Sequence, residues 1–447
     1  MQLPGTERIN EAGHLEIGGC DSLLLAERFE TPLYVLDETS IREAASRYIH
    51  SFEAEGLPFQ VLYASKALCT MAVLQIVHDE GCQFDVVSAG EIYTALAAGI
   101  EPNALYFHGN NKTAKELRYA IDTHVGHIVI DNLDELTRLQ EILRQRETTM
   151  RVLLRVTPGV EAHTHEYVQT GQEDSKFGLD LLSGQAMAAA QRANEDPHLI
   201  LDGLHCHIGS QIFTLASFEL AIEKMAAFAA RLQTELGIQI PWLNVGGGFG
   251  IRYTEEDRPF TPEAYVHAIC QATRHAFTSR HMPVPGVMIE PGRAIVGPAG
   301  TTLYRVGVRK EIPGIRTYIA VDGGMGDNIR PALYQARYEA LLANRAAEVP
   351  QERVSIAGRY CESGDMLVYD AFLPKVHVGD LVAITNTGAY TYSMASNYNR
   401  VPRPAMVLVK EGQADLIIER ERLESLIAFD RVPQRLRSLS AINAVAG

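Results

Sequence analysis

The first residue that could carry out covalent chemistry is a lysine at the end of an apolar segment. Phe59–Lys66 reads FQVLYASK, a β-prone run that predicts burial of Lys66 at a strand end. Burial makes an ammonium costly and lowers its pKa, and the neutral amine can then form a Schiff base with an aldehyde. A strand-end lysine can also extend its ammonium into solvent, so other residues must decide between the two interpretations.

Two turns that lie further along the chain could supply an anion-binding site and a carboxylate. A glycine run follows the apolar segment WLNV, and its backbone N–H groups could approach a phosphate; it consists of Gly246, Gly247 and Gly248. Its spacing matches neither the dinucleotide fingerprint nor the phosphate-binding P-loop. The second turn joins a carboxylate to a guanidinium, and it consists of Glu290, Pro291, Gly292 and Arg293.

Together these groups predict a pyridoxal phosphate site. A carboxylate that faces a pyridine nitrogen keeps the ring protonated, so that the ring can accept electrons. An arginine offers a bidentate clamp for a phosphate or a carboxylate. Lys66 would bind the aldehyde, the glycine run the phosphate, and Glu290 the ring nitrogen.

Polar residues recur at the carboxyl ends of the predicted strands. They are Lys66, Asp85, His108, Arg155, His207, Gly246–Gly248 and Glu290. Each has an ordinary explanation when taken alone: Asp85 could cap a helix, His108 could be a core histidine, and Arg155 could pair with a carboxylate. Taken together, they indicate one active-site mouth, because strand carboxyl ends form that face in a TIM barrel.

The elements that must position these residues are short apolar strands alternating with helices. The strands are expected at 59–66, 83–88, 104–108, 127–131, 151–157, 200–208, 242–245 and 287–290. Eight β/α units over about 230 residues are typical of a TIM (β/α)8 barrel, and a doubly wound open sheet is the competing arrangement. The barrel is favoured because the number of predicted strands is eight and because the candidate chemical groups are spread over nearly all of these strands.

The sequence pattern changes after Gly300: β-prone runs with alternating apolar and polar residues follow one another, and few helical stretches are expected. We therefore expect a second, β-rich C-terminal domain. The segment up to residue 37 is too short to fold alone and is expected to join that domain. The predicted division is 38–300 for the barrel, and 1–37 with 301–447 for the β-rich domain.

The β-rich region contains further candidate residues. Cys361 and Glu362 place a thiol beside a carboxylate, although a free cysteine is also a common small core residue. Arg330 and Tyr334 are four residues apart and share one face if the segment is helical; an exposed charged turn is the alternative. Tyr390 follows Gly388 and Ala389 in a third turn.

Composition excludes several classes of function. The chain has 447 residues, 46% of them hydrophobic and 21% charged, and a net charge of −15, which argues against nucleic-acid binding. The six cysteines form no CxxC pair and no zinc spacing with histidine, so no metal site and a reducing compartment are expected. Neither a secretory signal nor a membrane span is expected, and the protein is predicted to be cytoplasmic.

Motifs along nearly the whole chain resemble the fold-type III pyridoxal-phosphate decarboxylases, a family that includes ornithine, arginine and diaminopimelate decarboxylases. Within that family the chain is most similar to the diaminopimelate decarboxylases. The matching motifs are YASKA (63–67), DVVSAGE (85–91), FHGNNK (107–112), HTHEYVQTG (163–171), SKFG (175–178), HCHIGSQI (205–212), GGGFG (246–250), EPGR (290–293), RPALY (330–334), CESGD (361–365) and GAYTYSMASNYN (388–399). One departure is DGGMGDNIRP before Arg330, where a common family version reads DAGMNDLIRP.

The resemblance implies a role for each matched residue. Lys66 would carry the Schiff base with Asp85 nearby, His207 would stack on the ring, and Ser210 would join the glycine run at the phosphate. Pro291 and Gly292 would shape the turn that holds Glu290. The residues implied at the substrate are Arg293, Arg330, Tyr334, Glu362 and Tyr390, with Arg293 and Tyr390 also serving the cofactor, and Cys361 as the proton donor.

The resemblance also implies a homodimer with shared active sites, in which Cys361, Glu362 and Tyr390 come from the partner chain. The implied reaction is decarboxylation of meso-2,6-diaminopimelate to L-lysine and CO2, the last step of lysine biosynthesis. Arg293 and Arg330 suit a distal carboxylate, which ornithine lacks. Three alternatives remain: a decarboxylase for arginine or carboxynorspermidine, a racemase, and a non-catalytic regulator.

Overall fold

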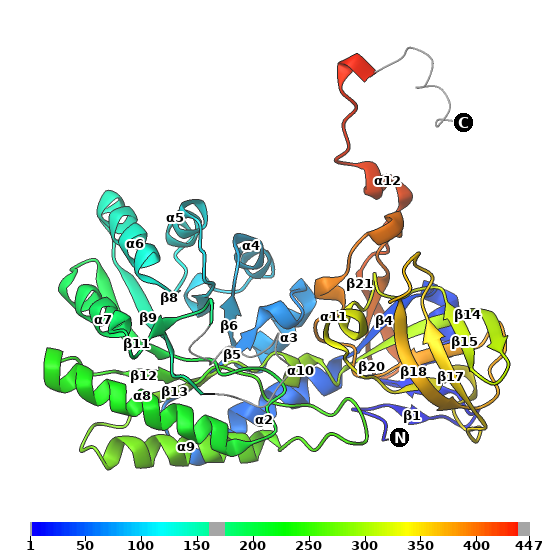
Figure 1. Ribbon diagram of the computed structural model, residues 1–447, viewed down its shortest axis with the longest axis horizontal. Helices are drawn as coiled ribbons and strands as arrows, with labels where there is room; N and C mark the ends of the chain where they lie inside the picture. Colours follow the sequence, from blue (N-terminus) through cyan, green and yellow to red (C-terminus); the bar gives the residue numbers. More distant parts are fainter. Residues whose placement is uncertain (1, 161–174, 437–447) are drawn as a thin grey trace.

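The computed structural model describes residues 2–160 and 175–436, so the HTHEYVQTG motif lies outside the described residues. Within that part of the chain there are two sheets of nine strands each and a small sheet of three strands. Figure 1 shows the two large sheets side by side, with helices surrounding the one whose strands lie within residues 59–289.

The first large sheet is a closed barrel of eight parallel strands, to which the short β10 (Leu179–Asp180) adds at β9. Its strands are β5 (Phe59–Ala64), β6 (Gln83–Val86), β7 (Leu105–Phe107), β8 (His127–Ile130), β9 (Met150–Thr157), β11 (Leu199–His205), β12 (Trp242–Asn244) and β13 (Gly286–Ile289). The last strand pairs with the first, Val287 opposite Phe59, and closes the ring. The predicted TIM barrel is therefore confirmed, and the open-sheet alternative is wrong.

The helices follow the strands in the order that the sequence predicts. They are α2 (Glu38–Glu55), α3 (Met71–Asp79), α4 (Ala89–Ala97), α5 (Ala114–Asp122), α6 (Leu133–Arg146), α7 (Gln185–Glu195), α8 (Leu215–Leu236) and α9 (Pro262–Thr278). Local chemistry marks several of their starts: Ser88 and Asn132 cap α4 and α6, and Thr113 forms a capping box with Glu116 at α5. Among the described helices, none combines the length and the apolar character that a bilayer crossing requires.

The barrel is filled by side chains, so its chemistry is confined to its ends. Leu62, Tyr106, Val129, Leu153 and Met288 form a buried cluster contributed by five different strands. Outside the ring, a larger apolar cluster packs the strands against the helices. Both faces of the strands are thus buried, which explains why the strands read as continuous apolar runs.

The second large sheet contains strands from both ends of the chain. Its C-terminal strands are β14 (Gly300–Ile312), β15 (Arg316–Val321), β16 (Ala340–Leu342), β17 (Glu352–Ala357), β18 (Met366–Leu373), β19 (Leu381–Ile384), β20 (Ala405–Lys410) and β21 (Gln413–Ile418). Strand β4 (Leu33–Asp37) lies between β14 and β20, with Leu33 opposite both Leu303 and Ala405. The N-terminal segment therefore joins the β-rich sheet, as predicted.

The residues before β4 cover one side of that sheet. They form β1 (Arg8–Ile9), β2 (Leu15–Ile17), β3 (Cys20–Asp21) and α1 (Ser22–Phe29). Leu15 and Ile17 are buried in one cluster with Leu33, Leu303 and Val407, which belong to the large sheet. Burial of these apolar side chains stabilises the attachment of the N-terminal segment.

The C-terminal end of the described chain leaves the body of the molecule. After β21 the chain reaches α12 (Leu423–Ile427) and continues to Leu436. Figure 1 shows this segment, in orange and red, extending away from both large sheets. An ion pair between Arg403 and Glu421 (2.6 Å) fastens the start of the segment.

Candidate active site

Lys66 follows β5 in a short 3-10 turn (Ser65–Ala67) and faces a buried carboxylate. Its Nζ donates to Asp85 Oδ2 at 2.9 Å; the Asp85 side chain is 1% exposed and the Lys66 side chain 40%. Burial acts to lower the pKa of Lys66, but Asp85, Tyr390 and Glu290 outweigh it and raise that pKa above its ordinary value. The predicted depression of the lysine pKa is therefore wrong here, because two carboxylates stabilise the ammonium.

Glu290 follows β13 and is buried beside two histidines. Its Oε1 lies 3.2 Å from His108 Nε2 and 3.2 Å from His205 Nε2. Burial opposes its charge, but His205, His108 and Lys66 outweigh that effect and hold the pKa of Glu290 well below its ordinary value. Burial also lowers the pKa of His108 to about 4, so its imidazole is neutral at neutral pH. The Glu290 carboxylate is therefore ionised although it is buried.

The same three side chains could also hold a cation, which the sequence did not predict. The donor atoms of His108, His205 and Glu290 all lie within 4.8 Å of one another, and all three residues are buried. His205 comes two residues before His207, a spacing that would place both on one face if the predicted strand 200–208 were continuous, although β11 ends at His205. That spacing is the signal that could have identified His205.

Asn244, at the end of β12, connects Glu290 to the glycine run. Its Nδ2 donates to Glu290 Oε1 at 2.8 Å, and its Oδ1 accepts from the N–H of Gly246 at 2.9 Å. Asn244 is fully buried. It thereby holds the carboxylate and the turn in one hydrogen-bonded arrangement. Sequence reasoning missed this residue, although it directly precedes the Val245–Gly248 turn.

The glycine run is required by close backbone contacts. A Cβ on Gly247 would lie 2.0 Å from the carbonyl oxygen of Glu290, and a Cβ on Gly248 would lie 2.1 Å from that of Gly209. Gly246 and Gly248 have positive φ angles of 72° and 96°. The N–H of Gly247 donates to His207 Nδ1 at 3.2 Å. The turn is therefore tightly built, and two of its three N–H groups already have partners within the protein.

The surroundings of His207 favour its uncharged imidazole. Burial lowers the pKa of His207 well below its ordinary value, and the positive charges of Lys66 and Arg155 add to the effect. Arg155 itself has the ordinary role considered above, because its Nε lies 3.8 Å from Asp131 Oδ1.

The turn that follows Glu290 packs against the end of β5. The N–H of Ala64 donates to the carbonyl oxygen of Pro291 at 3.2 Å. A Cβ on Gly292 would lie 2.9 Å from Ala64, so only glycine fits beside the Lys66 strand. Pro291 and Gly292 thus join the lysine and the carboxylate through the backbone.

Arg293 begins the short α10 (Arg293–Val296) and lies among hydroxyl groups. Its guanidinium donates to Ser210 Oγ at 3.0 Å and to Tyr253 Oη at 2.7 Å. Its Nε is buried without a hydrogen-bond partner among the described residues. Although burial alone would raise the pKa of Tyr253, the charges of Arg293 and Arg330 lower it. Ser210 and Arg293 are thus hydrogen-bonded to each other, and the neighbouring Gly209 lies against Gly248 of the glycine run, so the pair could receive an anion there.

A second buried arginine lies close to the first. Arg330 begins α11 (Arg330–Tyr334) and donates from Nε to Tyr338 Oη at 2.8 Å. Its Cζ lies 5.4 Å from the ring centre of Tyr334 and 5.8 Å from that of Tyr390. The Tyr390 ring also lies 4.7 Å from the Cζ of Arg293. Tyr390 therefore reaches this site from its own chain, which corrects its predicted origin in a partner.

The two arginines open onto one pocket of about 330 Å³. Its lining includes Ser210, Tyr253, Arg293, Arg330 and Tyr334. Two guanidinium groups on one small pocket predict a ligand with more than one anionic group. Tyr253 and Tyr338 were missed by sequence reasoning, since no motif or spacing distinguishes them from core tyrosines.

Cys361 and Glu362 lie on the surface of the chain, away from the residues at the barrel mouth. Both are exposed, in the loop between β17 and β18. The N–H of Cys361 donates to Asn399 Oδ1 at 3.0 Å. Among the described residues, neither side chain contacts Lys66 or Glu290. Within one chain, the predicted proton donor is therefore separated from the predicted lysine.

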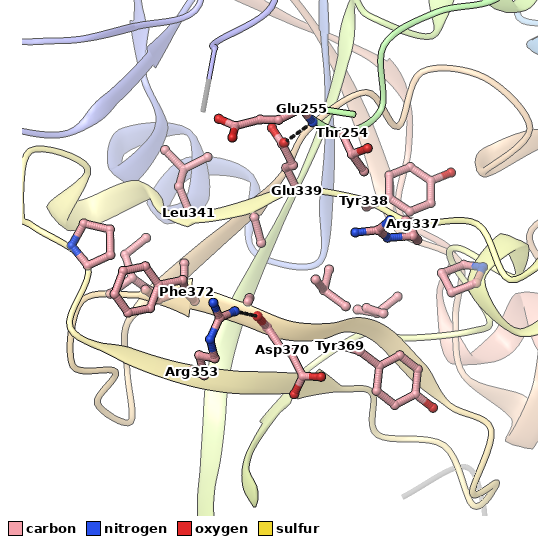
Figure 2. A pocket seen from close by; sticks show the side chains of 18 of the residues that line it. Thr254, Glu255, Arg337, Tyr338, Glu339, Leu341, Arg353, Tyr369, Asp370 and Phe372 are labelled. Carbon is pink, nitrogen blue, oxygen red and sulfur yellow. Dashed lines mark hydrogen bonds between the residues drawn. The ribbon is translucent and has the colours of Figure 1, made fainter. Parts of the chain in front are cut away.

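A larger groove of about 1190 Å³ lies on the β-rich domain and shares Thr254, Gln335 and Arg337 with the arginine pocket. Figure 2 shows two local hydrogen bonds in this groove: Glu339 accepts from the N–H of Glu255, and Arg353 donates to the carbonyl oxygen of Asp370. Lys66, Asp85 and Glu290 do not line it. The convergent chemistry therefore belongs to the barrel mouth and not to the larger groove.

The residues at the barrel mouth fit pyridoxal phosphate. The site offers an amine at Lys66, an ionised carboxylate at Glu290, and an anion-binding group in which Arg293 has a buried donor to spare. Asp85 also keeps a buried oxygen, Oδ1, without a hydrogen-bond donor among the described residues. These groups match the aldehyde, the ring nitrogen and the phosphate of the cofactor.

Known proteins resemble the chain over nearly its full length. Residues 38–297 match the family described as pyridoxal-dependent decarboxylase, pyridoxal binding domain. Diaminopimelate decarboxylase of Bacillus subtilis is 52% identical over 430 residues, which cover 96% of this chain and 98% of that protein. The diaminopimelate decarboxylase of Bacillus methanolicus is 50% identical over 429 residues, 96% of this chain and 99% of that one.

A solved structure agrees in fold. Diaminopimelate decarboxylase from M. jannaschii, in complex with L-lysine, superposes with a TM-score of 0.91 at 37% identity, covering 98% of this chain and 100% of that one. The chain belongs to the pyridoxal-phosphate-dependent decarboxylases and, within them, to the diaminopimelate decarboxylase family.

Proposed function

We propose that the protein decarboxylates meso-2,6-diaminopimelate to L-lysine and CO2, with pyridoxal phosphate as cofactor. The observation that carries the proposal is the convergence of Lys66, the ionised Glu290 and Arg293 at one barrel mouth. The relatives named above support the choice of substrate. The reaction would be the last step of lysine biosynthesis.

The cofactor would be held by residues that the structure places together. Lys66 would bind it covalently, with Asp85 at the amine and His207 against the ring. Ser210, Arg293 and the Gly246–Gly248 turn would hold the phosphate, with Tyr390 packed on the guanidinium and with Pro291 and Gly292 shaping the turn. When bound, pyridoxal phosphate supplies a protonated pyridine ring that accepts the electron pair left by the departing carboxylate.

The chain's own groups would keep that ring protonated and return a proton to the product. Glu290 stays ionised because His205 and Lys66 stabilise its charge, so it can hold a proton at the ring nitrogen. Cys361 would donate a proton to the α-carbon as general acid, and Lys66 is the other candidate donor. The neutral imidazole of His207 would exclude water from one face of the ring.

The distal end of the substrate would be recognised by charged and aromatic groups. Arg330 lies beside the same pocket as Arg293, with Tyr334 and Tyr390 against its guanidinium. We assign the distal carboxylate to Arg330 and the distal ammonium to Glu362. This assignment leaves Arg293 for the phosphate, because its partner Ser210 lies next to the glycine run.

The same proposal includes a homodimer with shared active sites. Cys361 and Glu362 are exposed and do not contact Lys66 within their own chain among the described residues. A second copy could supply them to the barrel mouth. We also propose a barrel domain at 38–300 and a β-rich domain at 1–37 with 301–447, supported by the place of β4 in the second sheet. A cytoplasmic location is proposed because all six cysteines are free.

The test is turnover by the full-length protein loaded with pyridoxal phosphate. We expect CO2 and L-lysine in equal amounts from meso-2,6-diaminopimelate, measured by CO2 capture and mass spectrometry. Lys66→Ala should abolish turnover and the absorbance band near ~420 nm of the bound Schiff base. Lys115→Ala, a change at an exposed lysine, should leave both unchanged.

Other outcomes would overturn the proposal. CO2 released from arginine or carboxynorspermidine but not from diaminopimelate would indicate a different decarboxylase. Epimerised substrate without CO2 would indicate a racemase. Bound cofactor without turnover of any of these amino acids would favour a non-catalytic role.

A further inference from the structure

The C-terminal segment carries an apolar surface that its own chain leaves uncovered. We call residues 423–436 the C-terminal arm. Five of its six large apolar side chains are exposed, namely Leu423 69%, Ile427 59%, Phe429 93%, Val432 57% and Leu436 59%, and Leu426 is half-buried. Leu423 and Ile427 lie on one face of α12, because they are four residues apart. So many apolar side chains on a short exposed segment indicate an interaction surface.

The arm is fastened to a turn on its own chain. Arg400 donates to the carbonyl oxygen of Leu426 and pairs with Asp430 at 2.9 Å. Arg400 belongs to the 3-10 turn η6 (Tyr398–Arg400). These contacts hold the middle of the arm, and they are polar, so they leave its apolar side chains uncovered.

The same turn also holds the loop that carries the proposed proton donor. Asn399 Oδ1 accepts from the N–H of Cys361 at 3.0 Å, and the Tyr398 ring stacks on that of Tyr360 at 5.9 Å. Tyr360 is buried. The Cys361 loop, the η6 turn and the C-terminal arm therefore form one connected unit, because η6 contacts both the loop and the arm.

We infer that the C-terminal arm packs on a second copy of the chain, next to the active site that receives Cys361. The inference rests on the proposed function, in which Cys361 completes the partner's Lys66 site. If the Cys361 loop enters a second copy, the arm attached to it through η6 comes to the surface of that same copy. A second copy is therefore the occupant that the connection favours over an unrelated protein.

The arm would stabilise the dimer in proportion to its apolar area. In a two-fold symmetric dimer each copy gives one arm and receives one, so every arm substitution acts twice. A charge placed on a buried apolar side chain opposes association strongly, because it would have to be desolvated without a partner. The arm should therefore control dimer affinity, whereas the chemistry of the assembled site stays with other residues.

The experiment measures the dimer dissociation constant of the holoenzyme by sedimentation over a dilution series. Ile427→Asp and Phe429→Asp should each weaken the dimer at least tenfold, and Phe429→Met should stay close to wild type. The matched control is Ile315→Asp, at a side chain that is 79% exposed in the turn between β14 and β15. The arm variants should also lose specific activity on dilution and recover it at high protein concentration.

The possible failures can be told apart. Arm variants that dissociate at the same concentration as the control would overturn the inference while leaving the proposed function intact. A wild-type protein that is monomeric and fully active at all concentrations would overturn the shared active site, and the arm inference with it. Arm variants with low activity at every concentration, but unchanged dissociation, would also count against the arm as a dimer contact.

Discussion

Glu290 depends on its neighbours to remain ionised in a buried position. Asn244 donates to its Oε1 and His205 is hydrogen-bonded to its Oε2, whereas His108 lies beside the carboxylate without a hydrogen bond among the described residues. A buried carboxylate without such donors would take up a proton and could no longer hold a proton at a ring nitrogen. At the scale of residues, the site is therefore built around the hydrogen bonds of one carboxylate.

Asn244→Ala should weaken cofactor binding. The change removes the donor to Glu290 (2.8 Å) and the acceptor for Gly246 (2.9 Å), so both groups lose a buried hydrogen bond. A loss of about 1–3 kcal/mol corresponds to a roughly 5- to 150-fold higher Kd for pyridoxal phosphate. Titration of the apoenzyme with pyridoxal phosphate measures this Kd, and Asn103→Ala, at an exposed asparagine, is the control. A Kd equal to that of the control would remove Asn244 from its positioning role.

Arg330→Ala should raise KM for meso-2,6-diaminopimelate more than it changes kcat. Arg330 is buried, and its Nε is oriented by Tyr338, so it offers a fixed clamp for a distal carboxylate. Losing a charged hydrogen bond of about 1.5–3 kcal/mol predicts a KM roughly 10- to 150-fold higher. Steady-state kinetics of Arg330→Ala measure this change in KM, and Arg231→Ala, at an exposed arginine, is the control. Unaltered kinetics would take Arg330 out of the substrate site.

The turn between β12 and α9 shows how one element fixes the position of another. Gly247 lies against the carbonyl oxygen of Glu290, so the glycine run and the end of β13 are in backbone contact. Neither segment can shift without the other. The phosphate site and the ring-nitrogen site are therefore coupled through their elements as well as through Asn244.

Gly247→Ala should therefore disturb both sites together. A Cβ only 2.0 Å from the carbonyl oxygen of Glu290 forces the backbone to move. We expect at least a tenfold loss of cofactor affinity, measured by equilibrium titration. Gly90→Ala is the matched control, because the nearest atom to its Cβ would be 3.6 Å away and its place in α4 suits alanine. Equal affinities in the two variants would contradict the coupling.

The elements were predictable from the sequence to a greater extent than the side-chain network. Apolar runs and capping residues such as Thr113 and Ser88 are local signals, so the barrel strands lie within a few residues of their predicted bounds and helices alternate with them as predicted. Asn244 and Tyr253 act through contacts between elements distant in the chain, and no local spacing records such contacts. The raised pKa of Lys66 likewise depends on Glu290, which follows a different strand.

At the scale of the whole molecule, the candidate groups are divided between exposed and enclosed surfaces. Lys66 and Glu290 lie at the barrel mouth, whereas Cys361 lies on an exposed loop of the β-rich domain. Tyr390 belongs to the barrel mouth of its own chain, against Arg293. One chain therefore holds most of the proposed site, and the missing acid is the group that a second copy would add.

Mixing two inactive variants should restore activity if the sites are shared. In a shared site, Lys66 comes from one chain and Cys361 from the other. A mixed dimer of Lys66→Ala and Cys361→Ala therefore contains one site with both residues intact and one site with neither. Random exchange of subunits predicts recovery of roughly a quarter of wild-type activity. Each variant alone, taken through the same exchange, is the control. Mixtures no more active than the separate variants would show that each site is completed within one chain.

The position of β4 has a consequence for the order in which the protein folds during synthesis. Leu33 is translated early, yet its neighbours in the sheet are Leu303 and Ala405, which are translated late. The barrel strands, from Phe59 to Ile289, can all pair before β20 exists. One edge of β4 can pair with β14 once Ile312 has been made, but the other edge stays unpaired, exposed to wrong partners, until Lys410 has been made. Ribosomes that stop short of that residue would release a chain with a complete barrel and an unfinished second sheet.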